Sequence, residues 1–154
     1  MQAKDIMSKN VVAIKKDTKI EDIATILIEN HISGVPVVDD DNHLIGIVTE
    51  GDLLHQETAP RLPGVFSLLG GFIYYNGLDR YRDDFKKLSA TIAEEIMTKD
   101  VLTIREDMDV ADIASIFVNK NVNRVPVLRN KKLIGIVSRA DILKTFLPRG
   151  EKEE

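Results

Sequence analysis

The chain has 154 residues, of which 44% are hydrophobic and 30% charged, which is the balance of a globular protein rather than of a disordered segment. The 21 Lys and Arg residues and 25 Asp and Glu residues give a formal net charge of −4, which offers no basic field to a nucleic acid. The sequence contains no Cys, which excludes disulfides, thiolate nucleophiles and Cys-ligated zinc. The charged start is unlike a signal peptide and no apolar stretch reaches the ~20 residues of a membrane helix, so we expect a soluble, cytoplasmic protein.

Two parts of the chain resemble each other closely. Residues 6–38 align with residues 96–128, and 13 of these 33 pairs are identical. Residues 44–54 then align with residues 133–143, and seven of these 11 pairs are identical. Such self-similarity indicates a tandem duplication. The expected domains are a first repeat at residues 1–55, an insert at 56–90, a second repeat at 91–147 and a charged tail at 148–154.

Each repeat has the same order of predicted elements: a strand, an amphipathic helix, a two-stranded hairpin and a second helix. The strands are short runs rich in β-branched residues, and the first helix follows from apolar residues at i, i+3, i+4, i+7 and i+8. In the first repeat the elements are residues 11–14, 20–28, 35–39, 43–49 and 50 onward; in the second they are 101–104, 110–118, 125–129, 132–138 and 139 onward.

Local signals refine these elements. The pattern Thr18-x-x-Glu21 predicts a capping box at the start of the first long helix. Residues 130–131 predict a short hairpin turn in the second repeat. Because proline lacks an amide donor, Pro36 and Pro126 are expected at a strand start or at a sheet edge.

The insert is unusually aromatic, since residues 56–90 hold six of the eight aromatic side chains. Residues 61–64 have turn chemistry, and Tyr81, Phe85, Leu88 and Ile92 have the spacing of a helix that leads into the second repeat. The aromatic side chains either cover a face of their own module or contact a subunit or partner.

These elements predict an α/β (α+β) fold made of two copies of one unit. The strand at residues 44–48 is apolar on both faces, so a single layer of helices cannot cover the sheet. We therefore expect the two copies to pack sheet to sheet about a pseudo-two-fold axis, with two equivalent clefts where they meet.

A hydroxyl and a carboxylate recur where the last strand of each repeat meets the second helix, as Thr49-x-x-Asp52 and Ser138-x-x-Asp141. Such a position can offer helix amides and a hydroxyl to a phosphate, and the carboxylate can accept hydrogen bonds from a ribose diol. The same pattern is also that of a capping box, in which both side chains satisfy the helix's own amides. The two roles can coexist.

The order of motifs resembles a known family. G-V-P-V-V followed by L-I-G-I-V-T-x-x-D-L-L, and R-V-P-V-L followed by L-I-G-I-V-S-x-x-D-I-L, resemble the two motifs of a CBS domain pair, or Bateman module. The resemblance implies a regulatory module that needs no cofactor and binds an adenosine-type ligand (AMP, ADP, ATP or S-adenosylmethionine) in clefts between the repeats. It also implies a homodimer that acts on an effector protein of unknown identity.

The resemblance also implies roles for particular residues. The Asp of each motif would hold the ribose, and the hydroxyl would serve the phosphate side. The backbone before each V-P dipeptide would read the adenine, and a pair on the first strand would line a purine slot or belong to the core. These residues are Ile32, Ser33 and Gly34 with Val12 and Ala13, and Val122, Asn123 and Arg124 with Leu102 and Thr103.

The two halves are predicted to be chemically unequal. Arg124 can reach a phosphate, whereas Gly34 at the matching position cannot, so we expect the site near Arg124 to be the tighter phosphate site. Arg139 adds a second cation where the first half has Glu50. Either arginine could instead be a solvated cation or half of a weak ion pair.

Other features predict neither a metal site nor catalysis. His31, His43 and His55 fall on different elements, and the acidic run at residues 39–42 lacks the Gly and distal Glu of a calcium loop. The sequence therefore favours a non-catalytic sensor of an adenosine nucleotide. Two alternatives remain open, namely a ligand-free assembly module and a small nucleotide-acting enzyme.

Overall fold

The computed structural model describes residues 1–58 and 90–148, which form two compact units. The first-repeat unit holds residues 13–39, 45–58 and 90–99, and the second-repeat unit holds residues 1–12, 40–44 and 100–148. Each repeat therefore packs with a leading segment that lies directly before the other repeat in the chain. The leading segment of the first-repeat unit is residues 90–99, and that of the second-repeat unit is residues 1–12. The predicted turn at 61–64, most of the helix expected before residue 92 and the tail beyond residue 148 lie outside the described residues.

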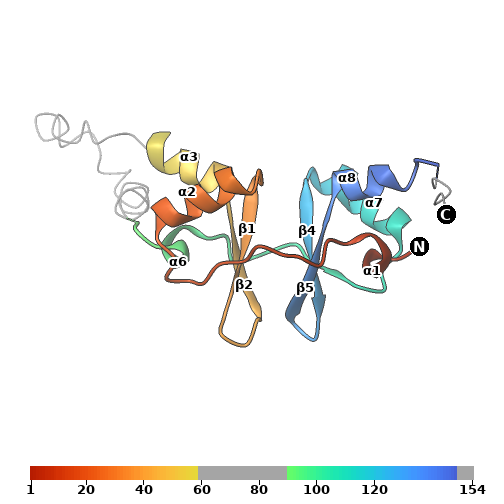
Figure 1. Cartoon of the computed structure of the whole chain (residues 1–154), viewed down its shortest axis with the longest axis horizontal. Coiled ribbons are helices and arrows are strands. Elements are labelled where there is room, and N and C mark those ends of the chain that lie inside the picture. The colour runs from red at the N-terminus through yellow and green to blue at the C-terminus, as the bar shows by residue number, and fades with distance from the viewer. Residues whose placement is uncertain (59–89, 149–154) are drawn as a thin grey trace, which may run out of the picture. The chain divides into compact units, whose positions relative to one another are not determined.

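The first-repeat unit contains helices α2 (Ile20–Glu29), α3 (Glu50–Thr58) and α6 (Ala93–Ile96) and strands β1 (Gly34–Val38) and β2 (Leu44–Thr49). The two strands form one sheet, and α2 and α3 lie together on one side of it (Figure 1). All five residues of β1 are buried, so this strand is the centre of the core.

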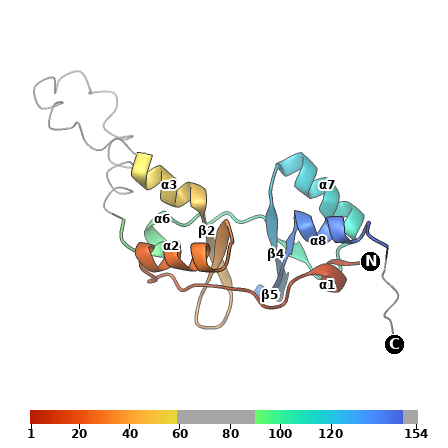
Figure 2. The same cartoon turned by 45° about the horizontal axis from the view of Figure 1, so that its top comes forward.

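The second-repeat unit repeats this arrangement with helices α1 (Ala3–Ile6), α7 (Val110–Lys120) and α8 (Arg139–Lys144) and strands β3 (Ile104–Arg105), β4 (Arg124–Arg129) and β5 (Lys132–Ser138). The sheet order is β3-β4-β5, and α7 and α8 cover one side of it (Figure 2). Asn130 and Lys131 both have positive φ angles, of 50° and 66°, which is the backbone of a two-residue hairpin turn. The predicted mixed α/β order of helices and hairpins is confirmed in both repeats.

The leading segment of each unit is fixed by backbone hydrogen bonds. In the second-repeat unit the amides of Ala3 and Lys4 donate to the carbonyls of Met108 (2.9 Å) and Glu106 (3.0 Å). The fully buried Ala3 belongs to the same core as the strands and helices of the second repeat. Ala93, the equivalent residue of the first-repeat unit, is also fully buried. The leading segments are therefore integral parts of the two cores.

A methionine of each leading segment packs directly on a strand glycine. A Cβ atom added to Gly135 would lie 2.5 Å from Sδ of Met7, and one added to Gly46 would lie 2.6 Å from Sδ of Met97. Beside the first pair, Ser8 and Ile136 exchange two backbone hydrogen bonds of 2.9 and 3.0 Å. Neither glycine has a positive φ, so close approach, not backbone conformation, explains the glycine of the L-I-G-I-V motif.

The first strand of each repeat is shorter than predicted. In the first repeat only Ile14 pairs with β1, through bonds to the carbonyl of Pro36 and the amide of Val38, both of 2.9 Å, and β3 has only two residues. Pro36 lies in β1, an edge strand of its two-stranded sheet, as expected, whereas Pro126 lies inside β4, the central strand of its sheet, so the expected placement was wrong for Pro126. The amide that proline lacks would be the next donor toward the first strand, so parallel pairing cannot extend further.

Two helix details also differ from the predictions. Thr18 does not cap α2, because the N-cap is Lys19 without a side-chain bond; the Thr18 hydroxyl accepts instead from the Lys15 amide at 3.1 Å. Ile28 and Val118, the last residues of the predicted apolar faces, are 73% and 78% exposed. At 3.6 residues per turn, such an i+8 position lies about 80° round the helix from position i, beyond the buried stripe.

Among the described residues, no helix combines the length and the apolar character needed to cross a membrane. The packing of one repeat's sheet on the other, and the clefts expected from it, stay predictions.

Candidate functional site

Thr49 ends β2 and Asp52 lies in the first turn of α3, and their side chains are hydrogen-bonded to each other. Oδ2 of Asp52 accepts from the Thr49 amide at 2.8 Å and from the Thr49 hydroxyl at 3.1 Å. The Asp52 amide in turn donates to the Thr49 hydroxyl at 3.3 Å. Within the described residues, Oδ1 of Asp52 accepts no hydrogen bond, so one carboxylate oxygen remains available to a ligand.

The second repeat builds the same arrangement from Ser138 and Asp141. Oδ2 of Asp141 accepts from the Ser138 amide (2.8 Å) and hydroxyl (2.7 Å), which forms a capping box at the start of α8. Oδ1 of Asp141 lies 3.6 Å from Nζ of Lys144. The capping alternative is thus real in both repeats, and each cap uses only one of the two carboxylate oxygens.

The loop before each V-P dipeptide lies beside this pair. The carbonyl of Ser33 accepts from the Glu50 amide at 2.8 Å, and the carbonyl of Asn123 accepts from the Arg139 amide at 3.1 Å. Gly34 also lies close to Thr49, since a Cβ atom added there would be 3.4 Å from Cγ2 of Thr49. The structure therefore brings together two of the predicted site elements, residues 32–34 with the Thr-Asp pair and residues 122–124 with the Ser-Asp pair.

The two arginines of the second repeat have different environments. The Arg139 guanidinium donates to the carbonyl of Val122 at 2.9 Å and to Oδ1 of Asn121 at 3.4 Å, so it fastens the loop after α7. Arg124 is half-buried and lies opposite Ser138 in the register of β4 and β5. Its guanidinium makes no side-chain hydrogen bond to any other described residue. Of these two arginines, Arg124 therefore has its whole guanidinium available for an anion, whereas Arg139 uses most of its donors within the repeat.

The residues predicted for a purine slot lie just before the first strand of each repeat. Leu102 and Thr103 precede β3, and Leu102 is 37% exposed, so it is not a core residue. Val12 is half-buried and Ala13 is exposed, and the chain passes from the second-repeat unit to the first-repeat unit between them.

A pocket of about 600 Å³ lies within the second-repeat unit. Only one of its lining residues, Asp141, was predicted as a site residue. The others come from the leading segment and from α8 and the residues after it. The full lining is Met1, Asp5, Ile6, Asp141, Lys144, Thr145 and Leu147. Sequence reasoning missed these partners because the two contributing segments are far apart in the chain and share no motif.

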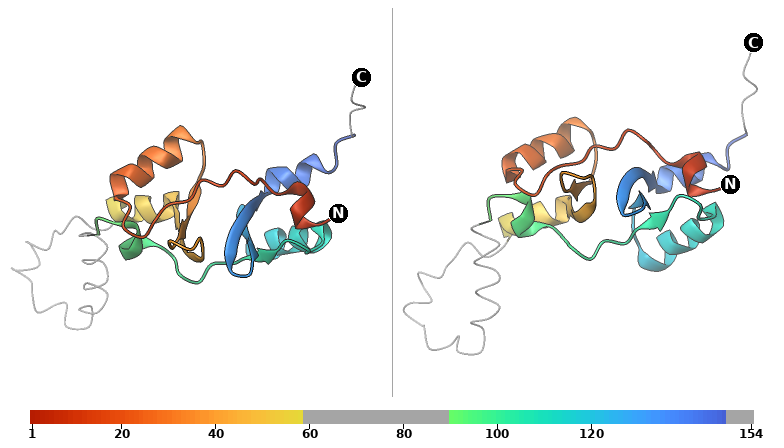
Figure 3. Two further views of the ribbon diagram at one scale, coloured as in Figure 1. Left: turned by 60° about the horizontal axis from the view of Figure 1, so that its bottom comes forward. Right: turned by 90° about the horizontal axis from the view of Figure 1, so that it is seen from below.

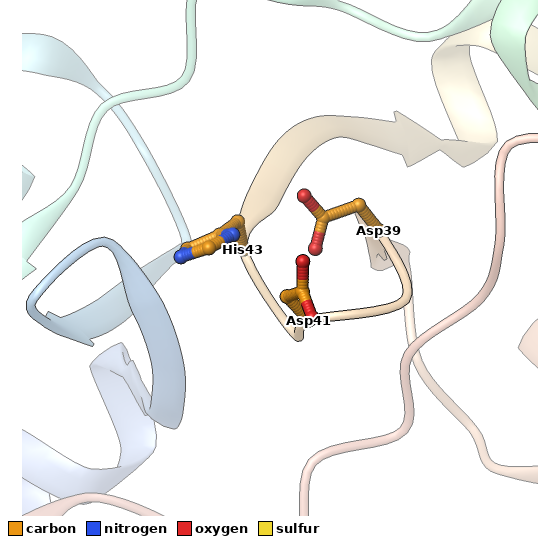
Figure 4. Close-up of side chains that lie close together, drawn as sticks. All are labelled: Asp39, Asp41 and His43. Carbon is orange, nitrogen blue, oxygen red and sulfur yellow. The ribbon is translucent and has the colours of Figure 1, made fainter.

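Three side chains of the turn between β1 and β2 could together hold a metal ion. Ligand atoms of Asp39, Asp41 and His43 all lie within 4.8 Å of one another (Figure 4), the one such group among the described residues. All three residues also take part in other interactions, and exposed acidic groups are common without an ion. The group therefore carries no metal assignment.

A bidentate ion pair between Arg129 and Glu106 lies outside the predicted site. Arg129, at the end of β4, donates to both carboxylate oxygens of Glu106 through Nε at 2.6 Å and through a second guanidinium nitrogen. The hydrogen bond from Arg129 lowers the pKa of Glu106 below its ordinary value, and the same hydrogen bond raises the pKa of Arg129. Because Glu106 also accepts the Lys4 amide through its carbonyl, the pair fixes the loop that receives the leading segment.

Both repeats match one family of known proteins. The CBS domain family matches residues 3–57 and 93–148. An uncharacterized protein of Methanocaldococcus jannaschii, MJ1426, is 31% identical over 96% of this chain and 92% of its own length. The CBS domain-containing protein DDB_G0289609 of Dictyostelium discoideum is 33% identical over 91% of this chain and 87% of its own length.

Two solved structures are similar along nearly the whole chain. The CBS domain pair of protein MJ0100, in complex with 5′-methylthioadenosine and S-adenosylmethionine, is 28% identical with a TM-score of 0.66 and covers 95% of both chains. CBSX2 of Arabidopsis thaliana, in complex with AMP, has a TM-score of 0.76 over 94% of both chains, and its 24% identity shows the fold alone. Because the family match covers both repeats and the relatives align over almost the whole length, this chain belongs to the CBS domain family, as a tandem pair.

Proposed function

We propose that this chain is a non-catalytic regulatory module that binds an adenosine-type ligand, whether AMP, ADP, ATP or S-adenosylmethionine. The observation that carries the proposal is the carboxylate oxygen of Asp52 and of Asp141 that the helix cap leaves unused, beside the loop that precedes each V-P dipeptide. Such an oxygen can accept hydrogen bonds from the vicinal hydroxyls of a ribose. The ligands of the MJ0100 domain pair, at 28% identity, both carry that ribose.

The other predicted site residues complete this proposal. The backbone of residues 32–34 and 122–124 would read the adenine edge, and the slot for the purine would be lined by Val12, Ala13, Leu102 and Thr103. Thr49 and Ser138 would serve the 5′ side of the ligand. Arg124 would supply phosphate contacts in the second repeat, since its donors are not used by other described residues. Arg139 would act as a positioning residue, because its guanidinium holds the carbonyl of Val122.

Regulation would follow from linkage. A ligand that binds one arrangement of the two units better than another shifts the population toward the preferred arrangement, and a partner that reads the difference responds. No step of this mechanism requires a cofactor, and we place the protein in the cytoplasm as part of the same proposal.

A homodimer is the second part of the proposal. Large apolar side chains are exposed at matching helix positions of the two repeats, namely Ile28 and Leu54 on α2 and α3 and Val118 and Leu143 on α7 and α8. Their exposed fractions are 61% or more, and a second copy of the chain would cover them. Sedimentation of the parent chain and of a Leu54→Glu, Leu143→Glu variant tests this point. A parent that sediments as a monomer at every concentration would contradict it.

Calorimetric titration with AMP, ADP, ATP and S-adenosylmethionine tests the ligand proposal. We expect saturable binding that Asp52→Asn and Asp141→Asn weaken, each at its own site. Asparagine keeps a side-chain oxygen for the helix cap but loses the charge that strengthens the ribose contacts, so both variants should fold. No heat and no thermal shift with any of the four ligands at millimolar concentration would refute the proposal.

The capping boxes favour one rival, a ligand-free assembly module in which Thr49 and Ser138 only begin their helices. In that case Asp52→Ala and Asp141→Ala would lower stability by about 1 kcal/mol each without changing any ligand affinity. The remaining rival is a nucleotide-acting enzyme, and incubation of the parent chain with ATP tests it. Turnover of ATP would support this rival.

A further inference from the structure

The leading segment of each unit rests on its sheet through a methionine. Residues 1–12 lie alongside β5 (Figure 3), where Sδ of Met7 would be 2.5 Å from a Cβ atom added to Gly135. The first-repeat unit repeats this contact between Met97 and Gly46, at 2.6 Å. Both methionines are half-buried. The two thioethers therefore occupy equivalent places that are tightly packed against the strand and only partly covered.

The backbone amides beside Met7 are already used. The amides of Ser8 and Ile136 donate to each other's carbonyls at 2.9 and 3.0 Å. The amide of Met7 itself donates to the carbonyl of Ala3 at 2.8 Å. A polar atom placed on the Met7 sulfur would thus meet amides that already have acceptors.

The first-repeat unit has the same set of bonds around Met97. The amides of Ile47 and Thr98 donate to each other's carbonyls at 3.0 and 2.9 Å, and the Met97 amide donates to the carbonyl of Ala93 at 2.8 Å. Leaving a polar group without a partner in such a contact is unfavourable. An oxygen atom on either sulfur would therefore have to leave the glycine in order to be hydrated.

Oxidation by a hydroperoxide places such an oxygen on a thioether. A sulfur lone pair attacks the terminal peroxide oxygen, an S–O bond forms and the O–O bond breaks. The leaving alkoxide or hydroxide takes up the proton of the transferred oxygen, so the products are a sulfoxide and an alcohol or water. Sulfur is oxidised and the peroxide is reduced. The apolar side chain becomes polar and chiral, which does not suit a contact that is closed even to a Cβ atom.

We propose that Met7 and Met97 are a matched pair of modification sites, at which sulfoxide formation by a hydroperoxide loosens the leading segment of each unit. The sequence contains no Cys, so its methionines are the sulfur groups that this chain offers to such an oxidant. A dithiol reductant reverses the change, because it returns the thioether and is itself oxidised to a disulfide with release of water. The proposal does not rest on nucleotide binding.

Peroxide titration of the full chain tests the proposal. Mass spectrometry of its peptides follows the sulfoxide at each of the four methionines, and hydrogen exchange follows the paired amides of each unit, Ser8 with Ile136 and Ile47 with Thr98. We expect these amides to exchange about five- to thirtyfold faster once the neighbouring methionine is oxidised, which corresponds to about 1–2 kcal/mol in a local opening equilibrium. Methionine sulfoxide reductases with dithiothreitol should restore the original exchange rates.

Met7→Leu and Met97→Leu are the decisive variants. Leucine nearly conserves the side-chain volume, so both variants should fold, but it has no sulfur to oxidise. Each variant should abolish the peroxide effect in its own unit and keep it in the other. Met108→Leu is the matched control: Met108 is also half-buried in the second-repeat unit but is not among the nearest neighbours of Gly135, so the effect at Ser8 should be unchanged.

Three results would overturn the proposal. The first is that Met7 and Met97 stay reduced at a peroxide concentration that fully oxidises Met1, which is 52% exposed. The second is that both are oxidised while the paired amides exchange at their original rates. The third is that faster exchange persists in the Met7→Leu and Met97→Leu variants, because another group then responds to the peroxide.

Discussion

Gly135→Ala tests how the leading segment is joined to the second repeat. The added Cβ would lie 2.5 Å from Sδ and 2.9 Å from Cγ of Met7, and 3.1 Å from the carbonyl oxygen of Ser8. The Met7 side chain can change its rotamer, but the Ser8 carbonyl is backbone and accepts the Ile136 amide at 3.0 Å. Relief of the clash therefore displaces either the methionine or the paired backbone.

The expected magnitude follows from three contributions. Overpacking of a filled site costs about 1–3 kcal/mol. Lower entropy of the unfolded chain offsets about 0.4–1 kcal/mol of this when glycine becomes alanine. Weakening of the bonds between Ser8 and Ile136 adds up to about 1 kcal/mol each. We expect a net loss of about 1–3 kcal/mol in the free energy of unfolding.

Equilibrium urea unfolding measures this loss, with Gly51→Ala as the control. A Cβ atom added to Gly51 meets only Oγ1 of Thr49, at an ordinary 3.5 Å, and the residue is helical, so alanine should stabilise by about 0.5–1 kcal/mol. The two substitutions are chemically identical and should have opposite signs. The double variant Met7→Ala, Gly135→Ala should recover part of the loss, as a positive coupling in a double-mutant cycle.

A Gly135→Ala variant as stable as the parent, with Gly51→Ala behaving as expected, would refute the close-packing argument. The glycine would then have to be explained by something other than the approach of Met7 and Ser8.

Three further predictions concern single contacts. The pKa of Glu106 is depressed in the folded state, so its pair with Arg129 stabilises the fold at pH values above the pKa of Glu106 in the unfolded chain. This stabilisation is lost as the pH falls through the pKa of Glu106 in the folded state. The difference in urea midpoint between the parent and Glu106→Gln should therefore shrink from about pH 6 to about pH 3. Ala3→Asp buries an unpaired charge and should cost about 3 kcal/mol or more, with hydrogen-exchange protection lost in β4 and β5 before β1 and β2. Arg139→Met removes the donor to the Val122 carbonyl and should cost about 1 kcal/mol while speeding amide exchange in residues 121–124; unchanged exchange there would contradict the positioning role.

Much of this fold is local and could be predicted from the sequence. The 3.6-residue periodicity of α2 and α7, the two hairpins and the helices that open at Glu50 and Arg139 all depend on residues close together in the chain. The same holds for the pairs Thr49–Asp52 and Ser138–Asp141, whose members are three residues apart. Because the two repeats are copies of one unit, the two pairs are expected to be equivalent.

The tertiary structure decided what depends on distant segments. No local pattern shows that Ala3 completes the core of the second repeat, that Met7 covers Gly135, or that Asp5 shares a pocket with Asp141, because these contacts join surfaces more than 100 residues apart. The capping box expected at Thr18 failed for the same reason: the Thr18 carbonyl accepts the amide of Ala93, so a tertiary bond set the local backbone. Short-range preferences determine where helices and strands form, whereas complementary packing between remote segments determines which side chains come into contact.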